Sequence, residues 1–134
     1  MSENEKQIRE LIHGWAAAVR GGELDAVTAN RADDVVMFDV PPPYEGVRGI
    51  EAYREAWPEF FEWLARGSGF DVLELEVEAG EDVAYAFALL RCGYADEIPG
   101  FPDNRLRLTV GLRRDGDGWV VAHEHHSFAN PPEG

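Results

Sequence analysis

The second half of the sequence constrains the fold most strongly, because it reads as four strand-like runs separated by turn sequences. The predicted strands cover residues 70–79, 83–94, 105–114 and 119–128. Residues 80–82 and 115–118 are the clearest turns, and the Asp-Gly-Asp-Gly order of the second is typical of a β-hairpin. A longer loop is predicted at residues 95–104. Strands joined mainly by hairpins predict an antiparallel sheet.

The first half of the sequence carries helical periodicity instead. The predicted elements are a helix after Ser2, a helix at residues 24–32, a strand at residues 35–38 and a helix at residues 49–65. Ser2 followed by Glu5 matches a capping box, Gly21 and Gly22 should end the first helix, and Pro58 should kink or break the last. Three helices segregated from antiparallel strands indicate an α+β fold with the helices on one face of a curved sheet, which leaves a pocket between the layers.

Composition narrows the class of protein. The 134 residues fit one domain, and the single cysteine, Cys92, excludes an internal disulfide and favours the cytoplasm. Asp and Glu total 26 against 12 Lys and Arg, a net charge of −14 that argues against nucleic acid or an anionic membrane as a partner. We find neither an apolar signal segment at the start nor an apolar run of membrane-spanning length.

Short motifs spread along the chain resemble the nuclear-transport-factor-2-like superfamily, in its SnoaL-like and ketosteroid-isomerase-like branch. They are Trp15, residues 22–25, residues 38–42, Gly46, Gly49, residues 107–109 and residues 118–127. The resemblance covers nearly the whole chain. It implies a cone-shaped α+β domain, with three N-terminal helices packed on a strongly curved, mostly antiparallel sheet and a pocket inside. It further implies a homodimer packed through the sheet, a small hydrophobic or polyketide-like ligand and no cofactor.

The last predicted strand carries three histidines. If the strand alternates regularly, one face holds Trp119, Val121, His123, His125 and Ser127. The resemblance turns this face toward the pocket, with His123 and His125 about 7 Å apart. Histidine suits proton transfer near neutral pH, so both rings are candidate catalytic groups. They could instead be hydrogen-bonded pocket lining, or bind a metal together with Asp39. His126 is expected to face outward or toward a subunit interface.

Asp39 is the third candidate catalytic residue. The resemblance matches it to the general-base aspartate of ketosteroid isomerases, and burial in an apolar pocket would strengthen such a base. The alternative is an aspartate that caps the turn before Pro41. Trp15 stands where those isomerases have a tyrosine, and their second aspartate falls near Arg107 or Thr109. Arg107 cannot act as a neutral acid, but it could stabilise an oxygen by charge.

The predicted strand at residues 105–114 can be oriented in two ways. Regular amphipathicity turns its leucines toward the core, whereas the resemblance turns Arg107 and Thr109 into the pocket and the leucines toward a partner subunit. We follow the resemblance here. The predicted ligand-binding residues are then Trp15, Tyr53, Trp57, Tyr85, Arg107, Thr109 and Ser127.

Three classes of function fit these features. The first is a cofactor-independent isomerase or cyclase that moves a proton on a small apolar carbonyl compound. The second is a module that binds such a compound without chemistry, and the third is an interaction domain. Because this fold supports isomerases, cyclases, hydrolases and binding proteins alike, the resemblance alone does not select among them.

Overall fold

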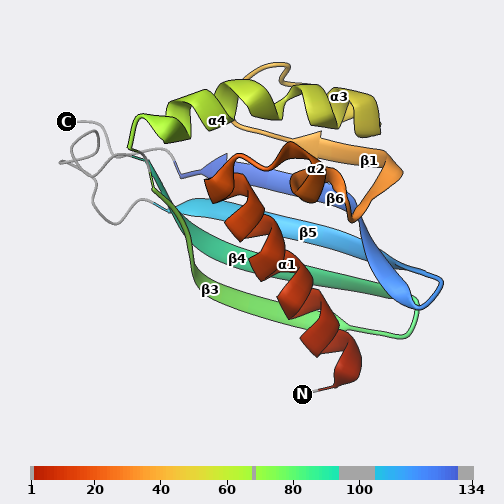
Figure 1. Ribbon diagram of the computed structural model, residues 1–134. Coiled ribbons are helices and arrows are strands. Elements are labelled where there is room, and N and C mark those ends of the chain that lie inside the picture. Colours follow the sequence, from red (N-terminus) through yellow and green to blue (C-terminus); the bar gives the residue numbers. More distant parts are fainter. Residues whose placement is uncertain (1, 68, 94–104, 130–134) are drawn as a thin grey trace.

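The computed structural model of the chain describes residues 2–67, 69–93 and 105–129 (Figure 1). Its elements are α1 (Glu3–Gly21), α2 (Leu24–Thr28), β1 (Arg31–Phe38), β2 (Val47–Arg48), α3 (Ile50–Glu55), α4 (Trp57–Ala65), β3 (Gly69–Ala79), β4 (Val83–Gly93), β5 (Leu106–Asp115) and β6 (Gly118–Phe128). The predicted α+β class with its mostly antiparallel sheet is confirmed. The predicted loop at residues 95–104 lies outside the described residues.

The ends of α1 follow the local sequence signals. The Ser2 side chain accepts a hydrogen bond from the Glu5 backbone N–H at 3.2 Å, as the capping-box pattern predicts. Gly22 adopts the left-handed conformation, with φ of 65°, at the C-terminal cap, where a side chain would be strained. None of the helices in the described ranges is both long and apolar enough to span a membrane.

Two predicted helices are shorter than expected. α2 ends at Thr28, and the chain enters β1 at Arg31, because the backbone here pairs with β6: the Val121 N–H donates to the Asn30 carbonyl at 2.8 Å. The predicted helix at residues 49–65 is divided into α3 and α4. Pro58 lies in the first turn of α4, where a missing N–H costs nothing, so the predicted break is confirmed.

Within the described ranges the strands form one six-stranded sheet in the order β2-β1-β6-β5-β4-β3. Among the strand pairs of the described residues only β1–β6 is parallel, and this pairing sets the first strand beside the last. β5 and β6 form a hairpin whose register shifts by one residue between Gly111 and Leu112. That shift is a β-bulge in β6, and it determines which side chains of β6 reach the interior.

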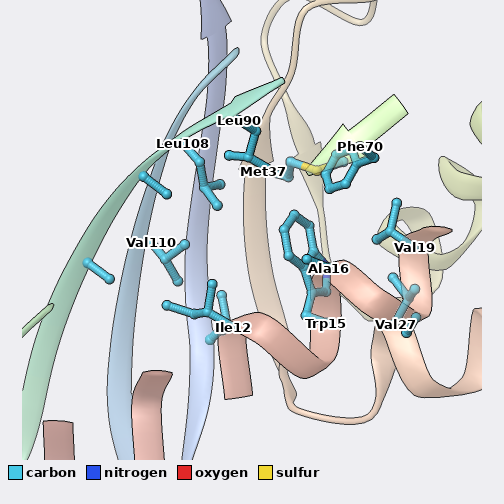
Figure 2. Close-up of a cluster of buried hydrophobic side chains, with 14 of the residues drawn as sticks. Ile12, Trp15, Ala16, Val19, Val27, Met37, Phe70, Leu90, Leu108 and Val110 are labelled. Carbon is cyan, nitrogen blue, oxygen red and sulfur yellow. The ribbon is translucent and has the colours of Figure 1, made fainter. Parts of the chain in front are cut away.

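The helices cover one face of this sheet, with α1 running diagonally across it (Figure 1). Figure 2 shows Ile12 and Trp15 of α1 facing Leu108 and Val110 of β5. The leucine face of β5 is therefore the buried face, and the prediction that Arg107 and Thr109 line the interior is wrong. The helices cover one face of the sheet, so β5 turns its apolar side chains toward that face, where they are buried.

Candidate functional site

A bulge in β6 reverses its faces halfway along the strand. Val121 pairs with Leu112 and His123 with Gly111, so Ala122 is an extra residue without a partner in β5. Trp119 and Val121 point inward before the bulge, and Glu124 and His126 point inward after it, as their burial shows. One extra residue shifts every later side chain of a strand to the opposite face.

His123 and His125 consequently lie on the outer face of the sheet, and the prediction that they project into the interior is wrong. The His123 Nδ1–H donates to the Val36 carbonyl at 2.7 Å, and His125 is exposed. Both rings pack edge-on against Phe38, at centroid distances of 5.0 and 5.8 Å. Other predicted lining residues share this outer face by register, namely Tyr85, Arg107, Thr109 and Ser127.

The interior face of β6 instead holds a buried ion pair between Arg31 and Glu124. The Arg31 Nη2 lies 2.5 Å and its Nε 2.7 Å from Glu124 Oε1, and the two side chains are 3% and 0% exposed. The Arg31 guanidinium also lies over the Trp15 and Tyr53 rings, 5.2 and 5.7 Å from their centroids. An ion pair can be buried in an apolar interior because the attraction between its two charges offsets the free-energy cost of removing them from water.

Tyr53 also holds the Glu124 side chain in place. Its hydroxyl donates to Glu124 Oε1 at 2.7 Å and accepts from the Arg31 Nε at 3.0 Å. Burial, and then the negative charge of Glu124, raise the pKa of Tyr53, so this hydroxyl stays protonated and donates. Burial acts to raise the pKa of Glu124, but the Arg31 charge and then His126 outweigh it and hold the pKa at about 2. Glu124 is therefore a carboxylate that only accepts hydrogen bonds.

His126 lies between two carboxylates. Its Nε2 is 2.9 Å from Glu124 Oε2, and its Nδ1 is 3.9 Å from Asp39 Oδ1. Because ionised Glu124 can only accept, we assign a proton to Nε2, which leaves Nδ1 as the nitrogen that gains or loses a proton beside Asp39. Burial acts to lower the pKa of His126, but its bond to Glu124 and the charges of Glu124 and Asp39 outweigh this and raise it.

Asp39 follows the end of β1 and marks the rim of this cluster. Its side chain is 28% exposed, in contrast to the buried Glu124 and His126. Its Oδ1 accepts a hydrogen bond from the Val40 N–H at 2.7 Å. This is the contact expected of an aspartate that caps the turn, and it does not prevent Asp39 from acting as a base. Burial and then the Asp39 charge raise the pKa of the nearby Cys92 thiol to about 12, so that thiol stays protonated and is a poor nucleophile.

Aromatic side chains from α1 and α4 pack against the His126 ring, and one from α3 lies behind them. Trp15 and Trp57 lie 6.0 and 6.4 Å from it, centroid to centroid, and Tyr53 packs against Trp57 at 5.8 Å. These three predicted lining residues are thus together in the interior. The buried indole N–H of Trp57 meets no hydrogen-bond acceptor among the described residues, although buried donors are ordinarily paired.

The alternative of a metal bound by His123, His125 and Asp39 is not supported by the geometry. The two histidines lie on the outer face, while Asp39 lies beside the inward-facing His126. Across residues 2–67, 69–93 and 105–129, no three His, Cys, Asp or Glu side chains are grouped so as to hold a metal ion.

Sequence reasoning missed Arg31, Glu124 and His126. The two-residue turn at the β5–β6 hairpin fixes a register in which uninterrupted alternation would turn His123 and His125 inward. The signal that could have corrected this is charge. A glutamate and a histidine two residues apart on one face need a buried cation if they face the core. Arg31 supplies that cation from the start of β1, where its register partner in β6 is Val121.

The cluster should make stability depend on pH in two opposite directions. The pKa of Glu124 falls from 4.5 to about 2 on folding, so its contribution is present above pH 4.5 and is lost on acidification toward pH 2. The pKa of His126 rises above 6.5, so its contribution is present below pH 6.5 and is lost as the pH rises through the raised value.

We expect the difference in free energy of unfolding between wild type and His126→Gln to shrink above pH 6.5 in urea titrations. A difference that stays constant with pH would contradict this.

Comparison with known proteins agrees with this architecture. The SnoaL-like domain family matches residues 8–131 of the chain. No curated protein matches it. Among solved structures, an NTF2-like protein of unknown function from Pseudomonas putida is 36% identical, with a TM-score of 0.79 over 92% of this chain and 84% of that one. A ketosteroid isomerase-like protein from Erwinia carotovora atroseptica shares the fold at 17% identity, with a TM-score of 0.65 over 98% and 100% of the two chains.

A family match that spans nearly the whole chain, together with the same fold in a relative at 36% identity, identifies the family. The chain belongs to the SnoaL-like domain family, within the NTF2-like fold.

Proposed function

We propose that the chain is a cofactor-independent enzyme of the cytoplasm that moves a proton on a small apolar carbonyl compound. Asp39 is the general base, and His126 donates a hydrogen bond to the carbonyl oxygen, in place of the predicted pair His123 and His125. The observation that carries the proposal is the direction of the His126 ring, whose Nδ1 faces the partly exposed Asp39 while Glu124 holds its Nε2. This arrangement has a base, a donor and a group that orients the donor.

In the proposed reaction the ligand lies beside Asp39, at the partly exposed rim of the cluster. The Asp39 carboxylate removes a proton from the carbon next to the carbonyl, and the electron pair of that C–H bond moves onto the carbonyl oxygen. The His126 Nδ1–H stabilises this oxygen as negative charge develops there. Asp39 then returns its proton to a different carbon, the carbonyl re-forms, and the protein recovers both original protonation states.

Buried Glu124 and Arg31 act through His126 rather than on the ligand. Glu124 is an ionised acceptor with three donors on one oxygen, from Arg31 and Tyr53, and one on the other, from His126. A fixed acceptor keeps the Nε2 proton in place, so the nitrogen that exchanges protons is the one beside Asp39. These two side chains are therefore positioning residues.

Hydrogen exchange tests the proposal whether or not the product is identified. Small cyclic and aromatic ketones are incubated with the protein in deuterium oxide, and NMR follows the loss of signal from protons next to the carbonyl. The proposal expects exchange well above the buffer rate for at least one class of ketone, and its loss in Asp39→Asn. Exchange that is unchanged in Asp39→Asn, or that never exceeds the rate in buffer, would refute a proton-transfer enzyme of this kind.

Ligand binding without chemistry is the second candidate, because the unpaired Trp57 N–H offers a donor for a ligand oxygen. It expects a ketone to raise the melting temperature of wild type but not of Trp57→Phe, with no exchange in deuterium oxide. Phenylalanine keeps the aromatic wall and removes the donor, so the comparison isolates the hydrogen bond.

We also propose that the chain forms a homodimer through the outer face of the sheet, as its resemblance to the superfamily implies. Three successive outward residues of β4 support this: Val83, Tyr85 and Phe87 are 66%, 51% and 51% exposed. A continuous run of exposed apolar side chains is typical of an interaction surface.

A further inference from the structure

His126 is held so that only one of its two ring nitrogens faces the rim of the cluster. Its Nε2 lies 2.9 Å from Glu124 Oε2, and its Nδ1 lies 3.9 Å from the partly exposed Asp39. The other oxygen of Glu124 accepts hydrogen bonds from Arg31 and from the Tyr53 hydroxyl. The carboxylate therefore cannot turn away from Nε2 without breaking these bonds as well.

This contact limits the protonation states in which Nδ1 can donate. A ring whose Nε2 proton is fixed carries a second proton on Nδ1 only when the ring is a cation. The neutral ring presents the lone pair of Nδ1 to the rim, where it would repel an oxygen that gains negative charge. The opposite neutral tautomer would turn a lone pair toward the ionised, buried Glu124, which is costly in an apolar interior.

We infer that the imidazolium form of His126 is the reactive form of the site and that the neutral ring is inactive. This inference rests on the proposed proton transfer and specifies the charge state in which it proceeds. When Asp39 takes the proton from carbon, the negative charge moves from its carboxylate to the ligand oxygen that the Nδ1–H binds. His126 keeps both of its protons, so one positive charge compensates the negative charge before and after the transfer.

The charged groups around His126 favour the cation. Burial acts to lower the pKa of His126, and the positive charge of Arg31 acts in the same direction. The bond to Glu124 and the negative charges of Glu124 and Asp39 outweigh both and raise the pKa. The site therefore holds two positive and two negative charges in its reactive form.

The remaining neighbours of the ring, among the residues that the structure describes, carry no charge. α1, α4 and β5 contribute Trp15, Trp57 and the register partner Leu108. The titratable groups near the cluster are Tyr53 on α3 and Cys92 on β4, and burial raises the pKa of both, so that they keep their protons. The protonation of the ring is therefore governed by its three charged neighbours.

The pH dependence of the exchange rate tests this charge state. NMR follows exchange of the small cyclic and aromatic ketones in deuterium oxide on both sides of the pKa that the His126 ring itself shows, with the buffer rate subtracted. We expect the wild-type rate to fall about ten-fold per pH unit above that pKa, because the fraction of cation falls by this factor. His126→Gln should lose this decrease together with most of its rate. His13→Gln, at an exposed histidine of α1, should keep both.

Glu124→Gln separates the charge of the ring from the presence of the ring. The Arg31 and Tyr53 donors need an acceptor, so they hold the glutamine oxygen and leave its NH2 group facing Nε2. The neutral ring then carries its proton on Nδ1. We expect a lower rate than in the wild type at low pH, because a neutral donor is weaker, but no decrease as the pH rises.

The possible results distinguish the inference from the proposed function. A wild-type rate that stays constant through the titration of His126 would overturn the cationic donor and leave the proton transfer standing. A decrease that persists in His126→Gln, or in folded Glu124→Gln, would do the same. Exchange that never exceeds the buffer rate at any pH would overturn the proposed function and this inference with it. Circular dichroism checks the fold, and the wild type with His126→Gln decides the question if Glu124→Gln does not fold.

Discussion

We expect Arg31→Met to lower the free energy of unfolding by about 3–5 kcal/mol. Methionine keeps much of the volume of arginine but removes the cation that neutralises Glu124, a carboxylate with 0% exposure. Glu124 would then keep only its bonds to Tyr53 and His126, which do not replace a full positive charge. Urea unfolding at neutral pH measures the change. A domain of this size has about 5–15 kcal/mol of stability in all, so the loss is large.

Arg54→Met is the matched control. Arg54 and Asp25 form an ion pair as short as the buried one, 2.5 Å from Nη2 to Oδ1, but both side chains are exposed. Solvent screens such a pair, so its loss should cost about 0–1 kcal/mol. Arg31→Lys keeps the charge without the planar fork and should fall between wild type and Arg31→Met. An Arg31→Met protein as stable as Arg54→Met would show that the buried pair does not stabilise the fold.

The second large effect concerns the proposed exchange reaction. On a ketone that the wild type exchanges, Asp39→Asn should lower the exchange rate about 10²–10⁴-fold, because the amide cannot accept the proton. Asp33→Asn, at an exposed position of β1, the strand that precedes Asp39, makes an equal chemical change away from the cluster and should keep the wild-type rate.

His126→Gln should lower the same rate about ten-fold or more, since it removes the donor that stabilises the developing oxygen charge. The matched control is His13→Gln, at an exposed histidine of α1, which should leave the rate unchanged. Equal rates in His126→Gln and wild type would remove His126 from the proposed chemistry and leave Asp39 as its sole reactive group.

The elements that local sequence determines were predictable. The Ser2 cap, the glycine end of α1 and the interruption near Pro58 are each fixed within a few residues by propensity and hydrogen bonding. The two-residue β2 was missed because an edge pair this short carries no periodic signal. The over-long second helix shows the opposite case, in which pairing of Arg31 with β6 outweighs local preference.

The site was harder to predict because it depends on one unpaired residue. The position of Asp39 after its strand could be read from the sequence, and so could the interior location of Trp15, Tyr53 and Trp57. The bulge at Ala122 exchanges the faces of the histidines that follow, and alternation has no means of detecting it. The orientation of β5, in contrast, follows from its leucines, and amphipathicity was the better guide than resemblance there.

The central claim is that Glu124 fixes the proton on the His126 Nε2 and leaves Nδ1 to titrate beside Asp39. Nitrogen NMR of isotope-labelled imidazole rings tests it most directly, with His126→Gln identifying the signal. We expect Nε2 to stay protonated across the titration while Nδ1 changes state with a pKa above the ordinary 6.5 of histidine. Glu124→Gln, whose amide can donate to Nε2, should move the proton of the neutral ring to Nδ1. A neutral ring that carries its proton on Nδ1 in the wild type, or one that never titrates, would contradict the account.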